Sequence, residues 1–189
     1  MTGLIIVKRV DWRKRAPRAP IAPFTWDSVL STYAGIDGEL WPTELFGVSE
    51  SPSGLLSGEH LQDVLNWWRT TPDSARCDLL WCDSIPPQAQ EQPSPDGFEF
   101  VGVDVGFEID EYTVYGYSAV YQDVVFGQFK ELTSFARFLN QHLLFPDAET
   151  AERFLRVRRN LSDTNVDLER ESDLGELLTL VVYRFSTRG

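Results

Sequence analysis

The chain has 189 residues, and its 29 acidic and 17 basic side chains give it a formal net charge of -12. Hydrophobic residues make up 42% of it and aromatic residues 13%, which excludes a disordered or collagen-like chain. The length suits one folded unit, so we expect residues 1–189 to form a single domain. No apolar run approaches the roughly 20 residues that span a bilayer, and the stretch from Gly3 to Val7 is too short for a signal peptide.

The charge is distributed unevenly along the chain. Residues 1–18 carry a net charge of +5, residues 19–136 carry -16, and residues 137–189 carry -1. Such an acidic middle segment repels the phosphates of nucleic acids and anionic lipids, and it attracts a basic partner or metal cations. The alternative interpretation is that the acidic side chains only keep the protein in solution.

The N-terminal quarter of the chain contains few regular elements. Residues 4–10 are rich in β-branched side chains and predict a short strand. Residues 13–23 are basic and have a proline at every third position from Pro17 to Pro23, so they predict an extended connector rather than a helix or a central strand. Thr25 can cap a helix over residues 26–33, and residues 35–56 predict irregular structure.

The next elements are a helix, a strand and a long loop. Ser57 can cap a helix that runs to about residue 69, whose apolar face consists of Leu61, Val64, Leu65 and Trp68, with Trp67 at its edge. Residues 77–82 predict a buried strand. Its two cysteines are five residues apart and point to opposite faces, so we expect reduced thiols and a cytoplasmic location. Four prolines and three glutamines in residues 84–97 predict a surface loop.

Residues 101–109 show the clearest strand pattern in the chain, because apolar and other side chains alternate with a period of two. One face has Val101, Val103, Val105, Phe107 and Ile109, and the other has Gly102, Asp104, Gly106, Glu108 and Asp110. Residues 113–121 and 124–129 predict two more strands with short connections, which indicates an antiparallel meander.

The C-terminal part adds two helices and a strand. Residues 132–143 predict a helix with His142 on its apolar side, and Asp147 can cap a helix that ends near residue 160. Residues 177–185 predict a hydrophobic strand. The expected fold is therefore α+β, an antiparallel sheet of about five to six strands with helices packed on it.

The motifs of common enzyme classes are missing. The sequence has no phosphate-binding loop and no dinucleotide-binding loop, and in residues 54–58 Ser57 stands one place too late for a nucleophile elbow. Neither His60 nor His142 lies in a metal-binding motif. We therefore predict no catalytic residue, no metal ligand and no cofactor.

The acidic strand and the tyrosines that follow it are the candidate partner-binding residues: Asp104, Glu108, Asp110, Glu111, Tyr115 and Tyr117. Asp104 and Glu108 are about 13 Å apart along a strand, too far to share one cation. Glu108 and Asp110 are about 7 Å apart, which fits a pair of catalytic carboxylates and keeps a hydrolase as an alternative. A solvated acidic face and a tyrosine-lined core are the structural alternatives.

The second half of the chain resembles small bacterial immunity-type proteins, which neutralise polymorphic toxins. The resemblance is carried by residues 102–108 (GVDVGFE), 115–121 (YGYSAVY) and 139–150 (LNQHLLFPDAET), followed by a charged helix. It implies an acidic α+β domain that covers the active site of a toxin. The predicted function is accordingly a non-enzymatic protein-binding module whose partner is a basic protein. We expect it to bind neither nucleic acid nor a membrane. The alternatives are a carboxylate-dependent hydrolase and an accessory protein of a larger assembly.

Overall fold

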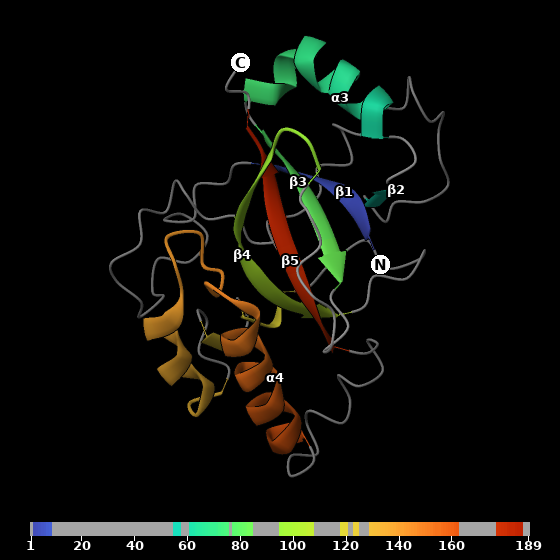
Figure 1. Cartoon of the computed structure of the whole chain (residues 1–189). Helices are drawn as coiled ribbons and strands as arrows, with labels where there is room; N and C mark the ends of the chain where they lie inside the picture. The colour runs from blue at the N-terminus through green and yellow to red at the C-terminus, as the bar shows by residue number, and fades with distance from the viewer. Residues whose placement is uncertain are drawn as a thin grey trace.

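The computed structural model (Figure 1) describes residues 2–8, 55–57, 61–75, 77–84, 95–107, 118–120, 123–124, 129–162 and 177–186, and the statements below refer to these residues. The strands are β1 (Thr2–Lys8), β2 (Leu55–Ser57), β3 (Cys77–Ser84), β4 (Phe98–Phe107) and β5 (Leu177–Phe185). The helices are α3 (Leu61–Thr70) and α4 (Ala148–Ser162), with 3-10 helices η5 (Pro72–Ala75) and η7 (Leu132–Phe138). The predicted connector at residues 13–23, the helix at 26–33 and most of the loop at 84–97 lie outside the described residues.

The strands form one sheet in the order β2-β1-β3-β5-β4, and every neighbouring pair is antiparallel. β5 comes last in the sequence, yet it lies between β3 and β4 and pairs with both (Figure 1). Its sequence, LLTLVVYRF, suits this central place because it is apolar on both faces. The outer edge of β4 is covered by two isolated bridges, from Val103 to Phe145 and from Gly106 to Ser118.

The predicted sheet of about five to six strands, built on a meander over residues 101–129, is wrong. Its body consists of three antiparallel strands, β3, β5 and β4, and β1 with the short β2 continues it beyond β3. Where the meander was expected, Ser118 makes a single bridge, and residues 119–120 and 123–124 are helical. Period-two alternation shows that a segment is a strand but not which strand lies beside it, and the neighbour of β4 proved to be the distant β5.

β4 contains a bulge between Phe100 and Gly102, which changes the side chains that share a face. Phe100 lies opposite Tyr183, and Val103 lies opposite Val181, so both point to the face of the odd-numbered residues of β5. The extra residue at the bulge interrupts the strict alternation, which by itself would have placed Phe100 on the same face as Asp104.

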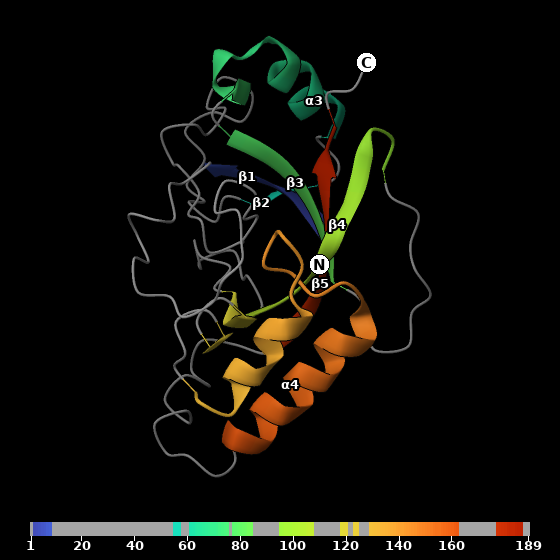
Figure 2. The ribbon, with the colours of Figure 1, turned by 90° about the vertical axis from the view of Figure 1, so that its left-hand side faces the viewer.

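The two long helices cover opposite ends of the sheet (Figures 1 and 2). In α3, Val64, Leu65 and Trp68 are buried and Trp67 is half-buried, which confirms the predicted apolar face. These side chains belong to one core with residues of β1, β3, β4 and β5: Leu4, Cys77, Leu79, Phe98, Val181 and Tyr183. The predicted cap at Ser57 is wrong, because Ser57 is in β2 and the helix begins at Leu61.

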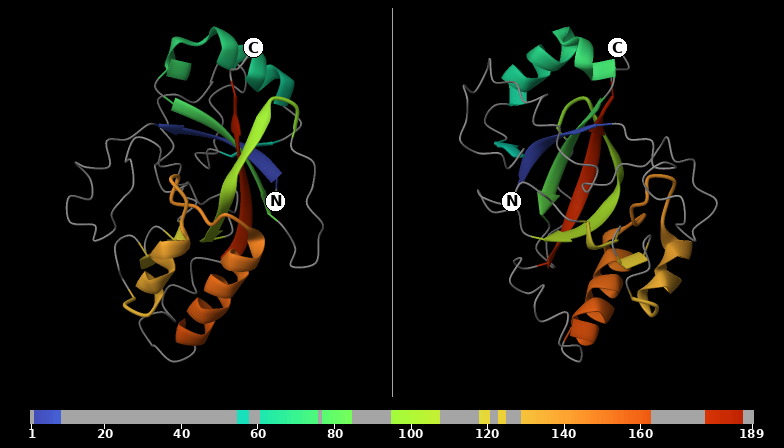
Figure 3. Two further views of the ribbon diagram at one scale, coloured as in Figure 1. Left: turned by 60° about the vertical axis from the view of Figure 1, so that its left-hand side comes forward. Right: turned by 180° about the vertical axis from the view of Figure 1, so that it is seen from behind.

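The second core lies between β4, η7 and α4 (Figure 3). Phe135, Phe145 and Phe154 meet there in mutual ring contacts with centroids 5.3 to 6.2 Å apart. Asp147 caps α4 as predicted, since its Oδ1 accepts a hydrogen bond of 2.7 Å from the backbone N–H of Thr150.

The helix predicted over residues 132–143 ends early. η7 stops at Phe138, and the chain then turns back to the edge of β4. Asn140 fixes this turn: its Nδ2 donates to the Val101 carbonyl at 2.8 Å, while its Oδ1 accepts from the backbone N–H of His142 at 2.8 Å. A side chain that satisfies backbone groups in this way competes with the helix, which accounts for the early end.

Candidate functional site

The structure describes one of the six candidate partner-binding residues. Glu108, Asp110, Glu111, Tyr115 and Tyr117 lie outside the described residues. Asp104 is described and has no exposed surface. Asp104 was expected on a solvent-exposed face of the strand. That face is covered instead, since Gly102 and Gly106, which share it, are buried as well. In this conformation the Asp104 carboxylate cannot touch a partner.

The neighbouring strands explain why Asp104 is buried. Asp104 lies opposite Leu180, and Gly102 lies opposite Val182, which in turn lies opposite Cys82. All of these residues are buried, and so are Val103 and Val181 on the opposite face, so both faces of the sheet are covered at this point. A strand covered on both faces can contain a polar side chain only where that side chain is hydrogen-bonded.

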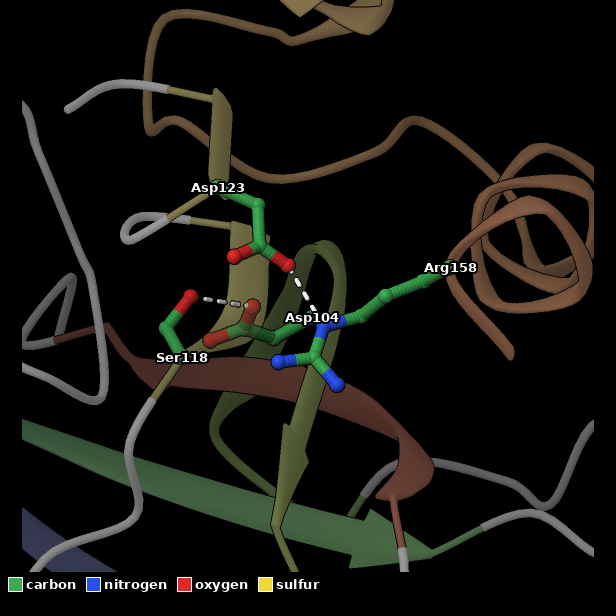
Figure 4. A network of polar contacts seen from close by, with 4 residues as sticks. All are labelled: Asp104, Ser118, Asp123 and Arg158. Carbon is green, nitrogen blue, oxygen red and sulfur yellow. Dashed lines mark hydrogen bonds and ion pairs between the residues drawn. The ribbon is translucent and has the colours of Figure 1, made fainter. Parts of the chain in front are cut away.

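Asp104 belongs to a buried polar cluster with Ser118, Asp123 and Arg158 (Figure 4). Its Oδ1 accepts hydrogen bonds from Ser118 Oγ at 2.7 Å and from the backbone N–H of Val105 at 2.9 Å. Arg158, on α4, donates from Nε to Asp123 Oδ2 at 2.5 Å, and the two side chains are 3% and 0% exposed. The cluster joins β4 and α4 to Ser118 and Asp123.

The position of this cluster indicates a structural role. Breaking a buried ion pair by removing one partner costs about 3–5 kcal/mol, because the remaining charge is left without compensation. A substrate has no access to carboxylates with no exposed surface unless the core opens. The cluster therefore holds Ser118 against β4 and Asp123 against α4 rather than presenting a reactive group.

Cys82 lies on the same face of the sheet as Asp104. Burial raises the pKa of its thiol far above the ordinary range, and the negative charges of Asp104 and Asp83 raise it further. Cys77 packs on the opposite face, in the core under α3, as its odd spacing from Cys82 predicts. Both cysteines are buried thiols and form no disulfide.

We expect the Cys82 thiol to be inert toward alkylation in the folded protein. In a Cys77→Ala variant, iodoacetamide at about pH 8.5, where half of an exposed thiol is ionised, should label the native chain far more slowly than the urea-unfolded chain. Because the folded-state pKa of Cys82 is raised, its protonated thiol contributes stability that is fully present below about pH 8.5, the pKa of an exposed thiol. This contribution is lost as the pH rises from there toward the folded-state pKa. Equal labelling rates of the native and unfolded chains would show that the thiol is accessible.

An exposed aromatic side chain lies near the other end of β4. Phe100 is 51% exposed, and it is the single large hydrophobic side chain that is exposed among the described residues. Its ring meets the edge of Tyr183 with centroids 5.9 Å apart, and Tyr183 is only 8% exposed. The ring thus rests on the sheet at one side and faces solvent at the other.

Charged residues lie near Phe100 along the chain. Asp96 and Glu99 are exposed and precede it by a few residues, and Arg184, the cross-strand neighbour of Glu99, is half-exposed. Glu99 and Arg184 point to the opposite face of the sheet from Phe100, because successive residues of a strand alternate. The local charge is therefore mixed, although the chain as a whole is strongly acidic. The sequence analysis missed Phe100, because its exposure depends on which distant elements cover this end of β4, and the alternation does not reveal that.

The described residues contain no group of three His, Cys, Asp or Glu side chains placed to hold a metal ion. His142 is 8% exposed and its Nε2 lies 3.3 Å from Gln141 Nε2. In the described part of the chain, no helix combines the length and apolar character needed to cross a membrane. Comparisons with protein-family models, curated proteins and solved structures found no match to this chain.

Proposed function

We propose that the chain is a non-enzymatic protein-binding module, and that Phe100 is the anchor of its docking surface. The observation that carries this proposal is the 51% exposure of a phenylalanine held against the sheet by Tyr183. Burying a Phe side chain fully contributes about 1.5–3 kcal/mol, so a partner that covers the ring gains binding energy. The strand fixes the backbone, which lowers the entropy lost on binding.

The charge of the chain supports a basic partner. With a net charge of -12, the protein attracts a positively charged macromolecule over long range and speeds its association. Because the charges beside Phe100 are mixed, we assign the affinity to the ring and the rate of encounter to the overall charge. The resemblance to immunity-type proteins leads to the same kind of partner, a basic toxin whose active site the module covers.

The proposal can be tested with the protein encoded by the adjacent gene, produced together with this chain. We expect a complex whose association slows as salt rises, because screening shortens the range of the attraction to about 10 Å at 0.1 M salt. Phe100→Ser should weaken the complex about thirtyfold, as expected for a residue at the centre of an interface. Surface plasmon resonance would measure both rates.

The matched control is Arg156→Ser, an exposed substitution on α4 at the opposite end of the sheet from α3. It should change the affinity less than about twofold. A complex that survives Phe100→Ser with unchanged affinity would remove Phe100 as the anchor. A complex whose association does not depend on salt would remove the basic partner.

A further inference from the structure

A second surface, formed by η7 and α4, contains two arginines over one aromatic ring. The Cζ atom of Arg137 lies 4.7 Å from the centroid of the Phe138 ring, and that of Arg153 lies 4.4 Å from the same centroid. The two Cζ atoms are therefore no more than about 9 Å apart. Arg153 also lies 5.6 Å from the centroid of Phe135, a core residue.

Neither arginine is neutralised within the part of the chain that the structure describes. Both side chains are exposed, and their only recorded interactions there are with the phenylalanine rings. Glu152, next to Arg153, instead accepts a hydrogen bond at 2.9 Å from Thr179 Oγ1 on β5. In a chain with 29 acidic side chains, two neighbouring arginines that have no carboxylate partner among the described residues form a local positive site.

The chemistry of the guanidinium group suits such a site to an oxyanion. Contact with an aromatic ring uses the face of the cation and leaves its N–H groups at the edge available as hydrogen-bond donors. The ring also restricts the side chain before a ligand arrives, which lowers the entropy lost on binding. A carboxylate accepts from two guanidinium forks only by sharing its two oxygens between them, whereas a phosphate has more oxygens and carries more negative charge.

We propose that Arg137 and Arg153 form a binding site for the phosphate group of a small molecule, either free phosphate or a phosphate monoester. The net charge of -12 repels a polyanion such as a nucleic acid, and this repulsion is much weaker for a ligand with one phosphate. The site is separate from Phe100 and does not depend on the proposed protein partner.

The test is isothermal titration of the full chain with inorganic phosphate, phenyl phosphate and acetate. We expect saturable binding of the two phosphates and at least about tenfold weaker binding of acetate, which can occupy one arginine fork. Tighter binding of phenyl phosphate than of inorganic phosphate would identify an ester as the source, and the reverse would identify free phosphate.

Variants assign the binding to the arginine pair. Arg137→Gln and Arg153→Gln should each weaken phosphate binding at least about tenfold, and Arg153→Lys should also weaken it, because lysine keeps the charge but lacks the fork. Arg156→Gln, which alters an exposed arginine one turn along α4, should have less than about a twofold effect. Circular dichroism would check the fold of each variant, and Arg137→Gln provides a second measurement if Arg153→Gln is unstable.

Three results would each overturn the proposal: no saturable binding of either phosphate, acetate binding of equal strength, or an equal loss in Arg156→Gln. The last of these would show that general attraction to the arginines of α4, rather than the pair over Phe138, holds the anion.

Discussion

Arg158→Leu is expected to lower the free energy of unfolding by about 3–5 kcal/mol, because it leaves the buried carboxylate of Asp123 without its cation. Most of this effect is the cost of a buried carboxylate that has lost its arginine rather than the net value of the pair. Urea unfolding followed by circular dichroism would measure it. Arg156→Leu, an exposed substitution two residues earlier on α4, should stay within about 0.5 kcal/mol of the wild type.

A second variant separates charge from packing. Adding Asp123→Asn to Arg158→Leu should recover part of the lost stability, because the amide removes the buried negative charge. If Arg158→Leu and Arg156→Leu cost the same, the ion pair does not hold α4 to residues 123–124.

Gly102→Ala should destabilise the protein by about 3 kcal/mol, combining about 1–3 kcal/mol of backbone strain with a similar amount of overpacking. Gly102 has a φ of +148°, where side chains are disfavoured. A Cβ atom there would lie 2.6 Å from Leu144 Cβ and 2.9 Å from the Phe145 carbonyl oxygen. Those atoms belong to the turn that bridges to β4, so they cannot move independently.

Gly97→Ala is the matched comparison. Gly97 also has a positive φ, of 85°, but its added Cβ would meet the ring of Phe185, which can shift. We therefore expect a smaller loss than for Gly102→Ala, measured by the same urea titration. Gly102→Ala should also speed hydrogen exchange at the amides of Val103 and Phe145, which bond across the bridge. Equal losses in the two variants would contradict the tight packing at Gly102.

Local patterns in the sequence predict the elements better than their arrangement. The apolar face of α3 and the cap of α4 follow from residues within one or two turns, and the strands near residues 4, 80, 103 and 181 follow from short apolar runs. The partner of β4 could not be predicted in this way, because β5 lies far along the chain. The early end of η7 depends equally on a distant contact, from Asn140 to Val101.

The candidate site was equally hard to predict from local sequence patterns. Asp104 stands between glycines in an acidic stretch, which is typical of a solvated strand, but its burial depends on Ser118 and on the strands beside it. The pairing of Asp123 with Arg158 joins residues 35 positions apart and leaves no local pattern. Only the exposed charges on α4 follow from its sequence, because they lie on the face opposite the core.

The central place of β5 has a consequence for synthesis on the ribosome. β3 and β4 are made well before β5, yet each pairs with β5 and neither pairs with the other. Until residues 177–185 emerge from the exit tunnel, each of these two strands has an open edge, a site at which nascent chains aggregate or recruit chaperones. The sheet is therefore completed only after β5 has been made, in one step that joins β3 to β4.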